Sequence, residues 1–178
     1  AVRPGGVEIV LGEGAREHAC TNYRDLAGTP PSSDIDAVHA AVGPASVAKV
    51  LFTSGSTGRP KGVVNSQHML TANQAMIAAW LPFLGNEPPV LVDWLPWHHT
   101  FGGNHNFGLV LANGGSLYID DGRPMPDGIG ATVRNLADIA PTLYFNVPKG
   151  FEALLPHLRA DAGLRRTFFS RLRLNFYS

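Results

Sequence analysis

The sequence predicts an α/β fold in which a mostly parallel sheet carries flanking helices. Short apolar runs alternate with segments of helical periodicity, which is typical of βαβ units. The 20 Gly and 14 Pro residues gather at intervals and mark the ends of short elements. A polar, glycine-rich loop also lies between an apolar run and a helical segment, as expected for a strand–loop–helix unit.

The composition excludes several classes of protein. A hydrophobic fraction of 44% and a charged fraction of 16% exclude intrinsic disorder. Fourteen basic residues balance fourteen acidic ones, so the chain lacks the charge expected of a partner of nucleic acid or of an anionic membrane. Cys20 is the single cysteine, and no apolar run approaches the roughly 18 residues of a spanning helix. We therefore expect a soluble, cytoplasmic protein.

The elements follow in chain order. Residues 1–45 form a poorly defined lead-in, with a strand over 7–11 and a helix over 34–41 that Asp34 is expected to cap. After this lead-in, the predicted strands are residues 47–52, 63–64, 90–94, 116–119, 142–147 and 172–177. The predicted helices are residues 66–80, 107–111, 132–140, 148–158 and 164–169.

The segments between these elements are expected to be irregular. Residues 95–104, rich in His and Gly, are predicted to form a loop, and residues 120–122 a simple turn. Trp80 and Trp94 are expected in the core, because aromatic residues next to buried strands usually pack there. Trp97, inside the loop, is the one tryptophan that we expect to contact a substrate.

The motif with the clearest chemistry is Thr-Ser-Gly-Ser-Thr-Gly-Arg-Pro-Lys-Gly at residues 53–62. Glycines let backbone amides approach an anion, hydroxyls donate hydrogen bonds, and a lysine adds a mobile positive charge. The loop therefore indicates phosphate binding. It is not a Walker A loop, because Pro60 occupies the position of the second glycine. The alternative interpretation is an ordinary surface loop between a strand and a helix.

Residues 51–63 resemble the signature loop of the adenylate-forming (AMP-binding) enzymes, which include acyl- and aryl-CoA synthetases. The resemblance implies a fragment of the large N-terminal α/β domain of such an enzyme. It also implies a catalytic role for Lys61 in steadying the ATP phosphates. The residues that would surround these phosphates are Thr53, Ser54, Gly55, Ser56, Thr57, Gly58 and Lys61.

A second segment, Trp-Leu-Pro-Trp-His-His-Thr-Phe-Gly at residues 94–102, is similar to the family's loop between the nucleotide and the acyl pocket. His99 falls on the family's histidine, which implies a catalytic role. The residues that would shape the substrate pocket are His99, Phe101, Gly102, His105 and Asn106.

The sequences of three segments, residues 98–106, 118–122 and 144–151, resemble those of feruloyl-CoA synthases. This resemblance implies a ligase that activates a hydroxycinnamic acid with ATP and Mg²⁺ and then transfers the acyl group to coenzyme A, in phenylpropanoid degradation. The whole chain, 1–178, is then a fragment, in which residues 46–178 hold the phosphate loop and the acyl pocket. The chain ends inside a strand-like run, the C-terminal domain is absent, and the isolated fragment is expected to be inactive.

Three alternatives stay open. The chain could belong to a fatty-acid or other acyl-CoA synthetase, or form a non-catalytic nucleotide-binding module. The third alternative is a metal-dependent hydrolase that uses His98, His99 and His105. A metal site needs three or four convergent ligands, and adjacent residues of an extended loop point in different directions, so we expect no metal at these histidines.

Overall fold

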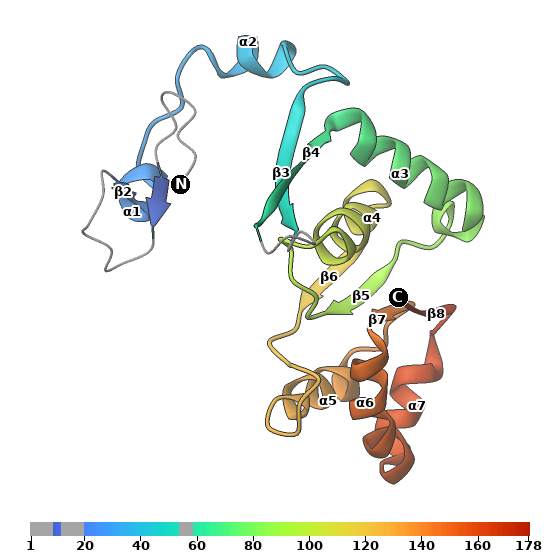
Figure 1. Cartoon of the computed structure of the whole chain (residues 1–178). Coiled ribbons are helices and arrows are strands. Elements are labelled where there is room, and N and C mark those ends of the chain that lie inside the picture. The colour runs from blue at the N-terminus through green and yellow to red at the C-terminus, as the bar shows by residue number, and fades with distance from the viewer. Residues whose placement is uncertain (1–8, 12–19, 54–58) are drawn as a thin grey trace. The chain divides into compact units, whose positions relative to one another are not determined.

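The computed structural model describes residues 9–11, 20–53 and 59–178 (Figure 1). The chain forms two compact units, of which the first ends at Gly43 and the second begins at Pro44. In the smaller unit, β1 (Ile9–Leu11) pairs in parallel with β2 (Cys20–Asn22), followed by α1 (Tyr23–Ala27) and α2 (Ile35–Ala40). The helix predicted over residues 34–41 is confirmed. Asp34 precedes it, but its side chain makes no capping hydrogen bond.

The larger unit begins with an antiparallel hairpin of β3 (Val47–Thr53) and β4 (Lys61–Ser66). Both strands lie where extended chain was predicted, but their direction departs from the parallel pairing expected for most of the sheet. The reason is the short connection between Thr53 and Lys61, since a parallel crossover needs a dozen or more residues.

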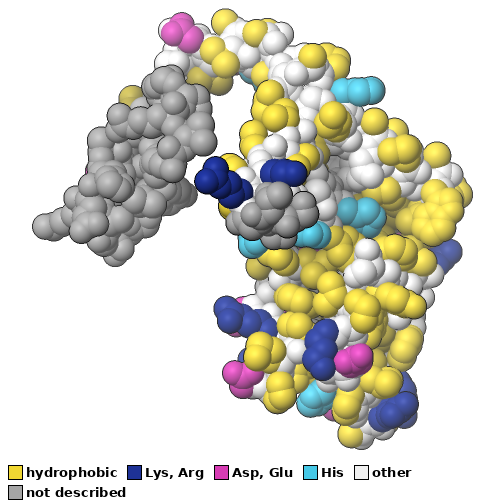
Figure 2. Space-filling view, viewed as in Figure 1, with side chains coloured by type: hydrophobic (Ala, Val, Ile, Leu, Met, Phe, Trp, Pro, Cys, Tyr) yellow, Lys and Arg dark blue, Asp and Glu magenta, His cyan; other side chains and the backbone are white. Residues whose placement is uncertain are grey.

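The hairpin leads directly into α3 (Gln67–Trp80), whose first turn is capped by Ser66 accepting a hydrogen bond from the Met69 amide at 3.3 Å. Pro82 begins the next element, η1 (Pro82–Gly85). The prediction that Trp80 lies in the core is wrong, because its side chain is 69% exposed. Met69 and Met76 are exposed too, and apolar side chains cover much of the visible surface (Figure 2). Helical spacing predicts that such residues share a face, but it does not say what covers that face.

Four strands form the centre of the larger unit: β5 (Val90–Asp93), β6 (Ser116–Ile119), β7 (Leu143–Asn146) and β8 (Leu174–Tyr177). β6 pairs in parallel with β5, and β8 pairs in parallel with β7. These pairs confirm the prediction of parallel strands with flanking helices.

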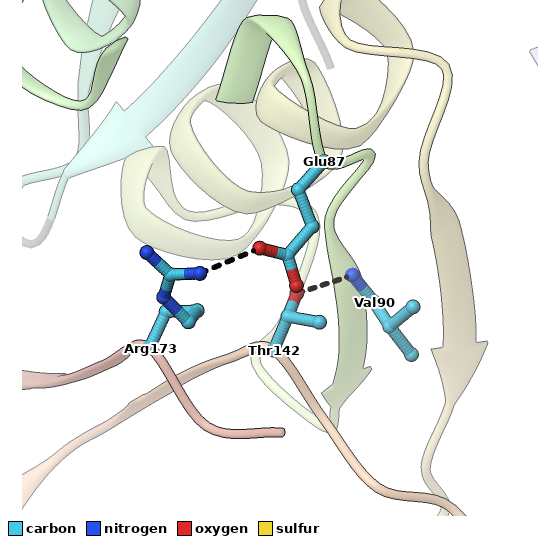
Figure 3. A network of polar contacts seen from close by, with 4 residues as sticks. All are labelled: Glu87, Val90, Thr142 and Arg173. Atoms are coloured by element: carbon cyan, nitrogen blue, oxygen red, sulfur yellow. Dashed lines mark hydrogen bonds and ion pairs between the residues drawn. The ribbon is translucent and has the colours of Figure 1, made fainter. Parts of the chain in front are cut away.

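Thr142 links the two strand pairs at the edge where β5 and β7 begin (Figure 3). Its hydroxyl accepts a hydrogen bond from the Val90 amide at 2.8 Å, and its own amide donates to the Val90 carbonyl at 3.0 Å. An ion pair of 3.0 Å between Arg173 and Glu87 lies beside this link (Figure 3). β5 and β7 therefore start at the same edge and run as neighbours.

Helices follow the strands as expected, with two differences. Residues 100–104, predicted as the end of a loop, belong to the helical segment η2 (Thr100–Asn106), which continues into α4 (Phe107–Ala112). The helix predicted from residue 132 begins earlier, as α5 (Ile129–Asp138). The last two helices are α6 (Pro148–Ala160) and α7 (Ala162–Ser170).

The core lies on both faces of the strands, because alternate residues of a strand point to opposite sides. On one face, Leu91, Leu143 and Phe145 pack with apolar residues of η1 and α4. On the other face, Val92 and Tyr144 pack against α5, α6 and α7. This arrangement explains why β5 and β7 are buried along most of their length. None of the described helices is long and apolar enough to cross a membrane.

The turn predicted at residues 120–122 contains a buried carboxylate that binds the next helix. Asp120 is buried and accepts hydrogen bonds from the Gly122 amide at 2.8 Å, the Thr132 hydroxyl at 2.6 Å and the Asn135 amide group at 3.0 Å. Thr132 and Asn135 belong to α5, so this one carboxylate fastens the end of β6 to the next helix.

Candidate functional site

The β3–β4 hairpin carries the predicted phosphate-binding residues. Thr53 ends β3 and pairs with Lys61, the first residue of β4. The Lys61 side chain is exposed, and within the described part of the chain it has no hydrogen bond or ion pair. Its ammonium group is therefore available to an anion. The other predicted phosphate ligands lie outside the described residues; they are Ser54, Gly55, Ser56, Thr57 and Gly58.

A cleft of about 790 Å³ lies where the parallel strands end. Trp94 follows β5, Val147 follows β7, and Ser178 follows β8; all three line the cleft. Open α/β sheets bind their ligands outside the carboxyl ends of the strands, so this is the expected place for a substrate. The remaining lining residues, from β4, α3, η2, β8 and the segment before η2, are Asn65, Met69, Leu70, Asn73, Leu95, Pro96, His99, Thr100, Phe101, Asn104, His105 and Phe176.

His99 lines this cleft from the N-terminal end of η2. Its Nδ1 accepts a hydrogen bond from the Phe101 amide at 3.2 Å. An acceptor nitrogen carries no proton, so in the neutral ring the proton lies on Nε2. His99 is therefore held as a hydrogen-bond donor through Nε2. Such a donor suits a carboxylate or another oxygen that carries negative charge.

An aromatic wall forms one side of the cleft. The ring centroids of Phe101 and His105 are 5.6 Å apart, and His105 lies 4.9 Å from Phe145. Phe176 of β8 packs edge-on against Phe101 at 6.3 Å and against Phe145 at 6.2 Å. Edge-to-face contacts at these distances are favourable, and they hold the rings in fixed orientations. The wall offers flat, apolar surface to a ligand.

The other two predicted pocket residues lie beneath the cleft and do not line it. Gly102 is buried, and a Cβ there would lie 2.7 Å from the carbonyl oxygens of Leu95 and Pro96. Asn106 is fully buried and donates a hydrogen bond through Nδ2 to Asp93 at 3.0 Å. The structure thus brings His99, Phe101 and His105 together at the cleft and places Gly102 and Asn106 behind them.

Polar contacts from the hairpin and from α3 hold η2 in place. Lys49 of β3 donates to the Gly103 carbonyl at 3.0 Å, and Gln74 of α3 donates to the Asn104 carbonyl at 3.0 Å. The Asn104 side chain donates to Asn65 of β4 at 2.8 Å. These long-range bonds explain why a segment rich in glycine is helical here.

Asp93 ends β5 and is buried beneath η2. Burial raises the pKa of its carboxyl group above the ordinary value of 3.8, and the nearby charge of Asp120 acts in the same direction. Hydrogen bonds from Asn106 and from the Leu95 amide, at 3.0 Å each, oppose that rise by stabilising the carboxylate.

Several lining residues were not predicted, among them Asn65, Asn73, Asn104 and Phe176. Asn104 lies within the loop that the sequence singles out, and only its side-chain direction was unknown. Phe176 belongs to a strand predicted for its apolar residues, and Asn65 directly follows the extended segment predicted over 63–64. No local pattern says that β4 and β8 end at one cleft.

The tryptophans differ from expectation. Trp94, predicted in the core, lines the cleft. Trp97, the predicted substrate contact, packs on Phe107 with ring centroids 5.0 Å apart and is not among the lining residues. Within the described residues, no group of three His, Cys, Asp or Glu side chains is arranged to hold a metal ion.

Comparison with known families gives a match over almost the whole chain. Residues 7–176 match the family model described as AMP-binding enzyme. A long-chain-fatty-acid–CoA ligase (ACSBG2) of Xenopus laevis is 27% identical over 141 residues, which are 78% of this chain and 18% of that protein. A medium-chain-fatty-acid–[acyl-carrier-protein] ligase (TtuA) of Teredinibacter turnerae is 35% identical over 103 residues, which are 56% of this chain and 16% of that protein. The chain thus spans less than a fifth of the length of these relatives.

Solved structures show the same fold. A malonyl-CoA ligase bound to methylmalonyl-CoA and AMP superposes with a TM-score of 0.62 and 28% identity, over 75% of this chain and 27% of that one. The ATP-bound MatB of Rhodopseudomonas palustris gives a TM-score of 0.57 and 26% identity, over 75% of this chain and 24% of that one. The expected α/β fold, that of the N-terminal domain of CoA ligases, is confirmed by these structures.

Proposed function

The chain belongs to the AMP-binding enzyme family, and on that premise we propose that it is part of an ATP-dependent ligase that joins an aromatic acid to coenzyme A. The observation that carries the proposal is the cleft at the carboxyl ends of the strands. It combines a histidine held as a donor, His99, with a wall of aromatic rings.

The proposed reaction has two halves. A carboxylate oxygen of the acid attacks the α-phosphorus of ATP, which forms an acyl-adenylate and releases pyrophosphate. The thiol of coenzyme A then attacks the acyl carbonyl carbon, forms the thioester and releases AMP. The difficulty in the first half is that an anion must approach a polyanion, so positive charge and hydrogen-bond donors at the phosphates lower the barrier.

Lys61 and the loop before it are proposed to hold the outer phosphates of ATP. Lys61 and Asn65 lie on the same strand, and at about 3.4 Å per residue their Cα atoms are about 14 Å apart. One strand therefore connects the phosphate loop to the acid-binding cleft, because Asn65 lines that cleft. His99 is proposed to donate Nε2–H to the carboxylate, and later to the adenylate, in the same cleft.

The aromatic wall supports an aryl acid. Phe101, His105 and Phe176 present ring faces and edges against which a flat substrate can stack. An apolar wall also limits the access of water to the reactive anhydride. Mg²⁺ bound to the ATP phosphates would neutralise part of their charge. No cluster of metal-ligating side chains occurs among the described residues, so we assign no step to it.

A fatty acid is the second candidate substrate. It is favoured by the curated relatives, since both of those named above are described as fatty-acid ligases. Both candidates share the chemistry at the carboxylate and differ only in the group that occupies the cleft.

The test is a comparison of acids with the complete enzyme that contains this chain. Thioester formation from 4-hydroxycinnamate, palmitate and malonate would be measured with ATP and coenzyme A. We expect 4-hydroxycinnamate to give the highest kcat/KM, with AMP and pyrophosphate as products. Faster turnover of palmitate would assign the cleft to fatty acids, and no thioester from any carboxylic acid would refute the ligase function.

A further inference from the structure

A buried hydrogen-bonded chain runs from β5 to the aromatic wall of the cleft. Asp93 accepts from the Leu95 amide through Oδ1 and from Asn106 Nδ2 through Oδ2, both at 3.0 Å. The other end of the Asn106 amide, Oδ1, lies 2.8 Å from His105 Nδ1. The three side chains therefore form one line, Asp93–Asn106–His105.

The carboxylate at the start of this line fixes every proton along it. A carboxylate only accepts, so the Asn106 amide turns its NH₂ group toward Asp93 and its oxygen toward His105. An amide oxygen also only accepts, so the facing nitrogen of His105 carries the proton. In the neutral ring the proton lies on Nδ1, and Nε2 keeps a free lone pair.

The two histidines of the cleft are thus held in opposite tautomers. His99 accepts at Nδ1 and presents Nε2–H, whereas His105 donates at Nδ1 and presents an accepting Nε2. Among the described residues, Nε2 of His105 has no hydrogen-bond partner. The ring is held between Phe101 at 5.6 Å and Phe145 at 4.9 Å, so this acceptor has a fixed place in an apolar wall.

We propose that His105 selects acids that carry a hydroxyl group at the end remote from the carboxylate, and that Asp93 and Asn106 are the positioning residues that keep it an acceptor. The hydroxyl would donate its hydrogen bond to Nε2 while His99 donates to the carboxylate end. This inference rests on the proposed function for the identity of the ligand as an acid. A phenolic acid meets both requirements and also fits the aromatic wall.

The hydrogen-bonded line Asp93–Asn106–His105 also predicts how the isosteric substitution Asp93→Asn would change the tautomer of His105. In Asp93→Asn, the new amide can still accept from the Leu95 amide, but it turns an NH₂ group toward Asn106. Asn106 would then rotate its amide by half a turn and present NH₂ to His105. Nδ1 must now accept, so the proton moves to Nε2 and the acceptor in the cleft becomes a donor.

Binding measurements on the complete enzyme test the proposal with a matched pair of ligands, 4-hydroxycinnamate and its methyl ether, 4-methoxycinnamate. The hydroxyl can donate, whereas the ether oxygen can only accept. We expect the wild-type protein to bind the hydroxyl compound at least about 10-fold more tightly. In Asp93→Asn this ratio should fall about 10-fold, because 4-methoxycinnamate gains a donor. Any steric cost of the methyl group is the same in both proteins and cancels.

Two further variants complete the design. His105→Phe keeps a ring in the wall and should remove most of the preference for the hydroxyl. Asp138→Asn changes an exposed carboxyl on α5 in the same way and should leave the preference unchanged. The ¹⁵N NMR signals of His105 report the tautomer without any ligand: the proton should lie on Nδ1 in the wild type and on Nε2 in Asp93→Asn.

An unchanged ratio in both Asp93→Asn and His105→Phe, or a proton on Nε2 in the wild-type protein, would overturn the proposal. Binding is measured apart from turnover, so the two hypotheses fail separately. Selective binding without thioester formation would support the selection by His105 and refute the ligase function. Thioester formation with equal binding of the two compounds would support the ligase function and refute the selection by His105.

Discussion

Lys61 is the residue whose proposed role can be tested with the least disturbance of the fold. Its side chain is exposed at the start of β4, so Lys61→Ala should leave the melting temperature unchanged. Loss of one charged donor at the phosphates should slow adenylation about 100-fold, equivalent to about 3 kcal/mol of transition-state stabilisation. Acid-dependent exchange of pyrophosphate into ATP measures this step.

Lys149 provides the matched control for that experiment. Lys149 is also exposed, and its partner is Glu152, one turn along α6, at 3.2 Å. An exposed pair of this kind contributes little to stability, so Lys149→Ala should change neither exchange nor melting. Exchange that is unchanged in Lys61→Ala would remove Lys61 from the phosphate site.

Asp93 should make the stability of the fold depend on pH. Burial raises the pKa of its carboxyl group in the folded protein, so ionising this group costs more free energy in the folded protein than in the unfolded chain. Its stabilising contribution is complete below about pH 4 and is lost as pH rises through the folded pKa. Asp93→Asn removes this loss, so its free energy of unfolding relative to wild type should increase between pH 4 and pH 7. Urea unfolding across that range measures the difference, and a flat difference would contradict the assignment.

For single residues, the sequence predicts which residue types form the pocket better than it predicts where each side chain points. The histidine and aromatic residues after Pro96 could be predicted as a pocket, and His99, Phe101 and His105 line one. That Asn106 would face Asp93 beneath the cleft could not be predicted, because the contact joins a helix to a strand thirteen positions away. Side-chain direction depends on the exact start of η2, which no local pattern gives.

At the scale of elements, η2 depends on close backbone packing. A Cβ at Gly102 would lie 2.7 Å from two carbonyl oxygens, which cannot move without shifting the chain. Gly102→Ala should therefore lower the free energy of unfolding by about 1–3 kcal/mol and weaken acid binding. Denaturant unfolding and calorimetry measure the two effects.

Gly85 is the control for this substitution, since a Cβ there meets nothing within 4 Å. Gly85→Ala should change the free energy of unfolding by no more than about 0.5 kcal/mol. Equal effects at Gly85 and Gly102 would show that η2 tolerates a side chain and that its packing is looser than the contacts indicate.

Asp120 links β6 to α5 through three hydrogen bonds. Asp120→Ala leaves the Gly122 amide and the side chains of Thr132 and Asn135 without their acceptor, which should cost about 3 kcal/mol of stability. The exposed neighbour offers a control, and Asp121→Ala should have almost no effect in the same urea titration. A small loss in Asp120→Ala would mean that water replaces the carboxylate.

The elements that could be predicted from sequence are those with a strong local pattern. α3, α6 and the strands β5, β6 and β7 all lie where periodicity and bounding Gly or Pro residues indicate them. The helical form of η2 could not be predicted, because bonds from Lys49 and Gln74 hold it. The apolar run of β4 does not give the strand's direction, which follows instead from the short connection after β3.

At the scale of the whole molecule, the parallel strands explain where the site lies. Segments that follow β5, β7 and β8 meet at one edge, and β4, which follows the proposed phosphate loop, reaches the same cleft through Asn65. Fold class and family could be predicted from the alternation of elements and from residues 51–63, and the family match confirms both. The hydroxycinnamic acid that the resemblance implies stays a prediction, because the family match does not distinguish between the acids that its members activate.

The central claim, that the enzyme activates an acid as its adenylate, makes a direct isotopic prediction. The oxygen that attacks the α-phosphorus stays with AMP when coenzyme A takes the acyl group. With 4-hydroxycinnamate labelled by ¹⁸O in its carboxylate, the complete enzyme should therefore produce AMP that carries one ¹⁸O atom, as measured by mass spectrometry. Label that appears in inorganic phosphate, with ADP as the nucleotide product, would show an acyl phosphate intermediate and contradict the account.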